Sequence, residues 1–152
     1  MRIESELKLG FKDVLIRPKR STLRSRAEVD LKRSYSFRYA THEWEGIPII
    51  AANMDTVGTF TMANTLAANS MLTMIHKHYR LDEWATFLEG KDDDFFNFFG
   101  VSIGVVDRDL NFAKEILGTY PQIRFLCIDV ANGYTELFVD FVKQARQLFP
   151  DK

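Results

Sequence analysis

MLTMIHK, residues 71–77, is an apolar run that ends in a lysine, and the chain repeats this arrangement of an apolar run followed by a polar or small residue. The other three runs are IPIIAANMD at 47–55, FFGVSIG at 98–104 and IRFLCIDVANG at 123–133. Buried strands of a parallel sheet are covered on both faces, which gives them this continuous apolar pattern. Helix-sized gaps separate the run ends, which are Met54, Lys77, Gly104 and Asp129 to Ala131. The pattern predicts parallel strands joined by helices.

Amphipathic segments fill the gaps between these strands. Apolar residues at helical spacing predict a helix over 81–88 that Gly90 stops, another that ends before Pro121, and a last one that ends at Pro150. Alternating strands and helices build the (β/α)8 TIM barrel, which typically needs about 250 residues. The chain has 152 residues and supplies only four such units. We therefore expect an α/β fold, the amino-terminal half of a TIM barrel.

The first 46 residues precede the first barrel strand. Apolar residues that alternate with polar ones predict a half-buried strand here, at Val29, Leu31, Tyr35 and Phe37. We expect this strand to be antiparallel and to pack across the floor or flank of the barrel. The sequence is thus divided into an amino-terminal extension with β-strands, residues 1–46, and four β/α units, residues 47–152.

The composition is that of a globular chain with no strong overall charge. Lys and Arg total 20 against 21 Asp and Glu, so the net charge of −1 favours neither nucleic acid nor an anionic membrane as a partner. A single cysteine excludes an internal disulfide framework and fits a reducing compartment. No apolar stretch approaches the ~18 residues of a membrane span. These features predict a soluble, cytoplasmic protein.

Two charged residues stand at predicted strand ends, where a barrel places its chemistry. At the mouth of the barrel the Lys77 ammonium could donate a proton or bind an anionic group, and a lysine that only extends into solvent is an equally good interpretation. Asp129 follows an apolar strand, so its carboxylate needs a partner such as a ligand hydroxyl or a facing ammonium. Cys127 lies on the same side one layer deeper, which favours a neutral core thiol over a nucleophile.

The strongest local charge feature is a basic run: Arg17, Lys19, Arg20, Arg24 and Arg26. A solvated loop is the simpler interpretation, because the rest of the chain is balanced in charge. A functional interpretation is that Ser25 and Arg26 hold a phosphate through a hydroxyl and a guanidinium. His76 and His78 flank Lys77, but no cysteine or carboxylate lies nearby at ligand spacing, so we expect no metal site.

Four motifs together closely resemble the amino-terminal half of proteins in the IMP dehydrogenase/GMP reductase family. They are LGFKDVLIRPKRSTLRSR at 9–26, PIIAANMDTVGTF at 48–60, HKHY at 76–79 and CIDVANGY at 127–134. The resemblance covers essentially the whole chain. IMP dehydrogenases usually insert regulatory modules soon after the HK motif, and their fourth-strand motif is typically DS-x-x-G. This sequence runs directly from 76–79 into the helix at 81–88 and has DVANG at 129–133, so the resemblance favours the reductases.

The resemblance implies an NADPH-dependent reductive deamination of GMP to IMP and ammonia. In the family a cysteine on a mobile loop attacks the purine at C2, ammonia leaves, and hydride from NADPH reduces the covalent thioimidate. Implied partners are GMP and IMP, the remaining half of the barrel, and further copies of the chain in a homotetramer. The family's catalytic cysteine loop, its potassium site, its phosphate-binding glycines and its flap match positions beyond residue 152. Residues 1–152 alone are therefore predicted to be inactive, and Cys127 is not that cysteine.

The family's site residues can be assigned to this sequence by motif. Lys77 and Asp129 match the pair that manages the proton of the departing ammonia and contacts the nicotinamide end. The remaining matches are Ser25 and Arg26 near the adenosine phosphate of NADPH, Val130 and Ala131 in the cofactor contact, and Ala52 and Met54 in the nucleotide pocket. One departure lies at Ile103, Val105 and Val106, where the reductases tend to carry small hydroxylated residues. The alternatives are an IMP dehydrogenase-like oxidoreductase without the regulatory insert and a non-catalytic, truncated half-barrel.

Overall fold

The computed structural model describes residues 4–40 and 42–152. The chain divides into two units, residues 1–30 and 31–152, which are described separately. The described part of the first unit contains two short 3-10 turns, Phe11–Asp13 and Arg26–Glu28. Every described residue of this unit is exposed, so it contributes no buried side chain to a core.

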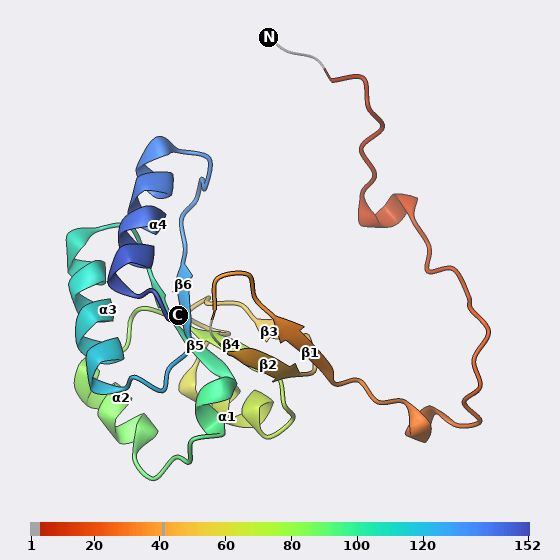
Figure 1. Ribbon diagram of the computed structural model, residues 1–152, viewed down its shortest axis with the longest axis horizontal. Coiled ribbons are helices and arrows are strands. Elements are labelled where there is room, and N and C mark those ends of the chain that lie inside the picture. The colour runs from red at the N-terminus through yellow and green to blue at the C-terminus, as the bar shows by residue number, and fades with distance from the viewer. Residues whose placement is uncertain (1–3, 41) are drawn as a thin grey trace. The chain divides into compact units, whose positions relative to one another are not determined.

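A parallel sheet forms the centre of the second unit (Figure 1). Its strands are β3 (Ile50–Ala51), β4 (Leu72–Ile75), β5 (Phe99–Ile103) and β6 (Phe125–Ile128). Each strand pairs with the next one in sequence, and the register aligns Ile75 with Val101 and Ile103 with Ile128. This order confirms the predicted parallel strands. Each strand is shorter than its apolar run, and β3 has only two residues.

The helices are α1 (Phe60–Ala67), α2 (Leu81–Leu88), α3 (Asp107–Thr119) and α4 (Glu136–Leu148). The Thr59 hydroxyl caps α1 by accepting from the Met62 N–H, and Thr135 caps α4 in the same way. Gly90 follows α2 with φ of 70°, a left-handed conformation that ends a helix and that glycine adopts without strain. The predicted helices therefore form where expected.

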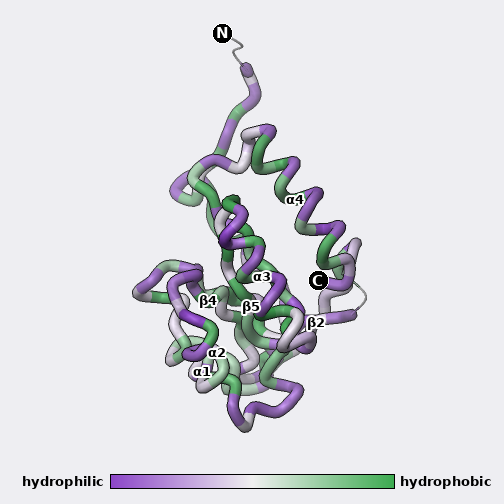
Figure 2. Tube along the Cα trace, turned by 90° about the vertical axis from the view of Figure 1, so that its left-hand side faces the viewer, coloured by the Kyte–Doolittle hydropathy of each residue, from purple (hydrophilic) through white to green (hydrophobic). Residues whose placement is uncertain are grey.

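The main core lies between the sheet and the helices. Figure 1 shows α2, α3 and α4 together on one side of the sheet, and Figure 2 shows hydrophilic and hydrophobic residues alternating along α4. All five residues of β5 are buried, and Phe99, Val101 and Ile103 pack with buried side chains of α2 and α3. Several phenylalanine rings are part of this core, since Phe99 makes ring contacts with Phe87, Phe95 and Phe96. Such aromatic pairs add to the stability of a core beyond the area that they bury.

A hairpin of β1 (Arg33–Ser36) and β2 (Glu43–Gly46) precedes the sheet. Trp44 of β2 is buried with Leu72 and Phe98, which lie at the amino ends of β4 and β5, and its indole N–H donates to the Asn97 carbonyl over 2.8 Å. The predicted strand is confirmed as antiparallel, and its hairpin packs at the floor of the sheet. Its expected extent is wrong, because Val29, Leu31 and Phe37 lie outside β1. The expected half-buried pattern is wrong for β1, because all four of its residues are exposed and the burial alternates in β2 instead.

Candidate functional site

The candidate site residues of the second unit lie at the carboxyl edge of the parallel sheet. Asp129 directly follows β6, whereas Lys77 comes two residues after β4. Ala52 directly follows β3, and Met54 lies two residues further on. Both are exposed, as are Lys77 and Asp129. Because all four strands are parallel, their carboxyl ends meet at one edge, which presents these residues together.

A buried histidine fixes the loop that carries Lys77. The strand β4 ends at Ile75, so His76 and Lys77 lie in the loop that follows it. The His76 N–H donates to the Gly58 carbonyl over 2.9 Å, and its ring stacks on Tyr79 with 4.2 Å between centroids. Its Nδ1 accepts from the His78 N–H. Burial lowers the pKa of His76, which favours the neutral ring that this acceptor role requires.

The ammonium of Lys77 pairs with Asp109, a residue that the sequence analysis did not single out. Lys77 Nζ lies 3.4 Å from Asp109 Oδ2, and the same oxygen accepts from the Gly104 N–H over 2.8 Å. Asp109 is the third residue of α3, where a carboxylate interacts favourably with the helix dipole. Its side chain is only 8% exposed, against 44% for Lys77. The pair is therefore anchored on the aspartate side and open to solvent on the lysine side.

Asp129 is in a different environment. It is exposed, and its backbone N–H donates to the Ile103 carbonyl over 2.9 Å. Its carboxylate has no hydrogen-bond or ion-pair partner among residues 4–40 and 42–152. Of the two partners expected for this carboxylate, a facing ammonium is not present among the described residues, and a ligand hydroxyl stays a prediction. Lys77 and Asp129 share the carboxyl edge, but the ion pair of Lys77 is with Asp109.

Cys127 lies in β6, two residues before Asp129, and its environment is the one expected for a core thiol. Leu126 and Ile128 line a cavity against α4, so Cys127 points to the opposite side of β6. Burial raises the pKa of the Cys127 thiol, and a nearby Ser102 hydroxyl offsets this only in part. A raised pKa keeps the thiol neutral at pH 7 and argues against a nucleophile. Val130 is half-buried and Ala131 is exposed, so the backbone of this loop is accessible to a ligand.

A cleft of about 350 Å³ adjoins the Lys77–Asp109 pair. It lies between the loop after β4 and the first turn of α3, and its charged lining groups include Lys77, Arg80 and Arg108. Three cations beside one buried carboxylate suit an anionic ligand. Ser25 and Arg26 belong to the first unit, where the Ser25 hydroxyl caps a 3-10 turn by accepting from the Ala27 N–H and Arg26 is exposed.

Comparison with known sequences identifies the family. The family described as IMP dehydrogenase / GMP reductase domain matches residues 8–152. The chain belongs to the IMP dehydrogenase/GMP reductase family. It is 55% identical over all 152 residues to a GMP reductase of Shigella boydii serotype 4 (strain Sb227), and 56% identical to one of Enterobacter sp. (strain 638). In each comparison the match covers 100% of this chain and 44% of the relative. The chain thus spans less than half the length of these curated relatives.

A member of the same family provides the structural comparison. The crystal structure of inosine 5′-monophosphate dehydrogenase from Legionella pneumophila superposes with a TM-score of 0.68 at 25% sequence identity. The superposition covers 91% of this chain and 40% of that chain. The parallel sheet is therefore part of a TIM barrel of the IMP dehydrogenase/GMP reductase type, as the sequence predicted.

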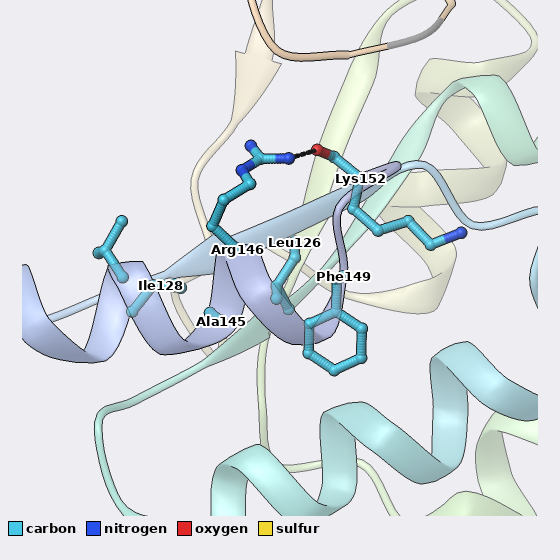
Figure 3. A pocket seen from close by; sticks show the side chains of 7 residues that line it. Leu126, Ile128, Ala145, Arg146, Phe149 and Lys152 are labelled. Atoms are coloured by element: carbon cyan, nitrogen blue, oxygen red, sulfur yellow. Dashed lines mark hydrogen bonds between the residues drawn. The ribbon is translucent and has the colours of Figure 1, made fainter.

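Other features of this family member lie outside the carboxyl edge. A cavity of about 160 Å³ lies between β6 and α4 and is lined mainly by apolar side chains. Figure 3 shows the residues that line it. Arg146 spans it and donates to the Lys152 carbonyl. Across residues 4–40 and 42–152, no group of three or more His, Cys, Asp or Glu side chains could hold a metal ion. No helix in the described part of the chain is long and apolar enough to cross a membrane.

Proposed function

We propose that this chain is the amino-terminal part of a GMP reductase, which converts GMP to IMP and ammonia. The observation that carries this proposal is the 55% identity to GMP reductases over every residue of the chain. The likeness to IMP dehydrogenase rests on 25% identity. An IMP dehydrogenase-like oxidoreductase without the regulatory insert remains the alternative, and it would oxidise IMP with NAD⁺ instead of consuming NADPH.

The residues at the carboxyl edge fit NADPH as the hydride donor. Arg80 and Arg108 line the cleft next to Lys77 and can neutralise the phosphates of NADPH. Lys77 and the accessible loop of Asp129, Val130 and Ala131 would contact the nicotinamide end. Ser25 and Arg26 would hold the adenosine phosphate through a hydroxyl and a guanidinium. When bound, NADPH supplies the hydride that replaces the 2-amino group of the purine.

In this proposal the chain's own residues bind the purine and manage one proton. Ala52 and Met54 are exposed at the edge next to β3 and would line the nucleotide pocket. The Lys77 ammonium can give a proton to the departing amino group, and the open Asp129 carboxylate can accept a hydrogen bond from it. Because Asp129 has no partner among the described residues, no internal contact must break when a ligand arrives.

The central experiment measures GMP-dependent NADPH oxidation and ammonia release in an intact enzyme that carries this sequence. Lys77→Met or Asp129→Asn should lower kcat by about 100-fold or more, the usual scale for acid–base groups, with a smaller effect on GMP binding. Lys114→Met is the matched control, since Lys114 is exposed on α3 and should leave kcat unchanged. Wild-type turnover in either variant would remove that residue from the mechanism, and IMP oxidation with NAD⁺ would favour the alternative.

A second experiment tests the cofactor contact. Arg26→Ala should raise the Michaelis constant for NADPH by about 10-fold and leave that for NADH nearly unchanged, since only the phosphate contact is lost. Arg17→Ala, in the same basic run, is the control for a general loss of charge. Equal effects on both cofactors would mean that the basic run is only a structural loop.

We also propose that residues 1–152 have no GMP reductase activity by themselves. The strands β3 and β6 are the edges of the sheet, and Ile50 of β3 is 59% exposed. Unpaired edges with apolar flanks recruit partners, so the polypeptide should self-associate or require the complementary half of the barrel. Sedimentation and NADPH oxidation with GMP test this. A monomer with GMP-dependent activity would overturn it, and would also refute the view that the attacking cysteine lies in a different segment.

The remaining assignments follow the family. We propose that the complete enzyme works in the cytoplasm as a homotetramer and binds potassium at a site outside these residues. Gel filtration with light scattering would test the tetramer, and activity measured with sodium in place of potassium would test the cation.

A further inference from the structure

The buried carboxylate of Asp109 is the one acidic group in direct contact with Lys77 among residues 4–40 and 42–152. Its Oδ2 receives the Gly104 N–H over 2.8 Å and the Lys77 ammonium at 3.4 Å. The Gly104 bond joins the end of β5 to the first turn of α3, so the carboxylate is held in place by the backbone. A buried carboxylate is costly without partners, and here it has a neutral donor and a cation.

The close approach of the Lys77 ammonium and the Asp109 carboxylate depends on Gly104. A Cβ at position 104 would lie 2.7 Å from Asp109 Oδ2 and 3.0 Å from Lys77 Nζ. Both distances are too short for an ordinary contact, so a side chain at this position would push the ammonium or the carboxylate away. Gly104 therefore leaves the space in which the pair forms.

The charges around the pair explain why one carboxylate can direct the lysine. Arg108 lies 3.7 Å from the other oxygen, Oδ1, and Arg80 lines the same cleft but pairs with Asp82. Without the carboxylate, the Lys77 ammonium would face only cations across this cleft and would turn toward solvent. The half-exposed lysine thus depends on Asp109 for a defined position.

From these contacts we propose that Asp109 is a positioning residue that holds the Lys77 ammonium at the carboxyl edge for the proton transfer. This inference rests on the proposed function of Lys77 as the group that protonates the departing ammonia. Asp109 touches neither substrate nor cofactor in this proposal and acts only through Lys77. The competing explanation is that Asp109 merely fastens the β5–α3 loop through the Gly104 N–H.

The Asp109→Asn variant separates these explanations in an intact enzyme. The amide oxygen still accepts from the Gly104 N–H, whereas the ion pair with Lys77 is lost. We expect kcat to fall by about 10- to 100-fold, the cost of a misplaced catalytic group, with less than about twofold change in the KM for GMP. Asp107→Asn, an exposed acid in the same turn of α3, removes the same charge and should leave kcat unchanged.

A double-mutant cycle then tests whether the effect passes through Lys77. In a Lys77→Met background, Asp109→Asn should lower kcat by less than about twofold, because the group that it positions is absent. An equal fall in both backgrounds, or an unchanged kcat in the single variant, would overturn the inference. If the wild type lacks GMP-dependent NADPH oxidation altogether, the proposed function fails instead, and the two failures are distinguishable.

A second readout needs no activity. Acetic anhydride acetylates accessible lysine side chains, and the ion pair holds the Lys77 nitrogen 3.4 Å from Asp109 Oδ2, where the reagent reaches it less easily. Mass spectrometry should show that Asp109→Asn speeds acetylation of Lys77 by about 2- to 5-fold, the scale of a partly exposed ion pair, while Lys114 is unaffected. An unchanged rate at Lys77 would show that the ion pair does not form in solution and would overturn the inference.

Discussion

The carboxyl ends of β5 and β6 differ in enclosure, although their sequences have the same pattern of an apolar run followed by a polar or small residue. The end of β5 is enclosed: its five residues and Gly104 are buried, and the nearby Asp109 is buried with two donors. The end of β6 is open: its four residues are half-buried, and Asp129 is exposed. Within these residues β5 lies between two strands and β6 pairs with β5 alone, which accounts for the difference in enclosure.

The largest expected effect is on the free energy of unfolding, and it comes from truncating the first residue of β5 or of β6. Phe99 of β5 is fully buried in the aromatic core, so Phe99→Ala should lower the free energy of unfolding by about 3–5 kcal/mol. Phe125 of β6 is half-buried, so Phe125→Ala should lower the free energy of unfolding by less. Urea denaturation of the 152-residue polypeptide provides both values. An equal cost at Phe125 would break the comparison, because it would mean that another copy of the chain covers β6 in solution.

A smaller effect on stability is expected from replacing the glycines near the two strand ends, Gly104 after β5 and Gly133 after β6. Gly104→Ala places a Cβ 2.7 Å from Asp109 Oδ2, and overpacking of this kind costs about 1–3 kcal/mol. Gly133→Ala meets only Phe138, at 3.6 Å, which is an ordinary contact, so its cost should be close to zero. Thermal denaturation of both variants checks the contrast. A Gly104→Ala protein as stable as the wild type would show that the β5 end is looser than its geometry indicates.

The pH dependence of stability extends the comparison to the end of β4. Burial lowers the pKa of His76 below its ordinary 6.5, so the proton binds more tightly to the unfolded chain. The stability contributed by neutral His76 is present above pH 6.5 and is lost as pH falls through the lowered pKa. His76→Gln should therefore weaken the fall in melting temperature between pH 7 and pH 5. Burial also lowers the pKa of His42, so this residue should preserve part of the fall in melting temperature in the variant. A wild-type slope in the variant would contradict this assignment.

The smallest effect concerns the thiol beneath the open end. Since burial raises the pKa of Cys127 above 9.0, iodoacetamide should label it far more slowly at pH 7 than a free cysteine peptide. Site-resolved mass spectrometry can follow the reaction in the intact protein. Rapid labelling at pH 7 would show that the opening at β6 extends one layer deeper than Asp129.

Local periodicity predicted the elements well, because burial on one helical face or on both strand faces is written into neighbouring residues. The helix at 81–88 and its stop at Gly90 are examples. Strand length was less predictable, since an apolar run such as 47–55 reports burial and not backbone pairing. The prediction that β1 is half-buried was wrong for a related reason. Alternation of apolar and polar residues predicts that one face is covered, but it does not say whether another element covers that face.

Asp109 was missed because an acid in DRD at the start of a helix looks like a solvated first-turn residue. Its burial arises from the approach of the loop after β4, which no local pattern reports. The one available signal was Gly104 at the end of a buried run, because a glycine there indicates a close approach by another group.

The sequential order of the sheet has a consequence for biosynthesis. Each strand from β4 to β6 pairs with the strand that left the ribosome immediately before it, with one α-helix made in between. No strand has to wait for a distant segment, so β3 to β5 can pair while later residues are still being translated, at roughly 5–20 residues per second. Such short-range pairing keeps the loop-closure cost of each step low. The emerging chain can therefore grow its sheet one edge at a time, with the newest strand always serving as the template for the next.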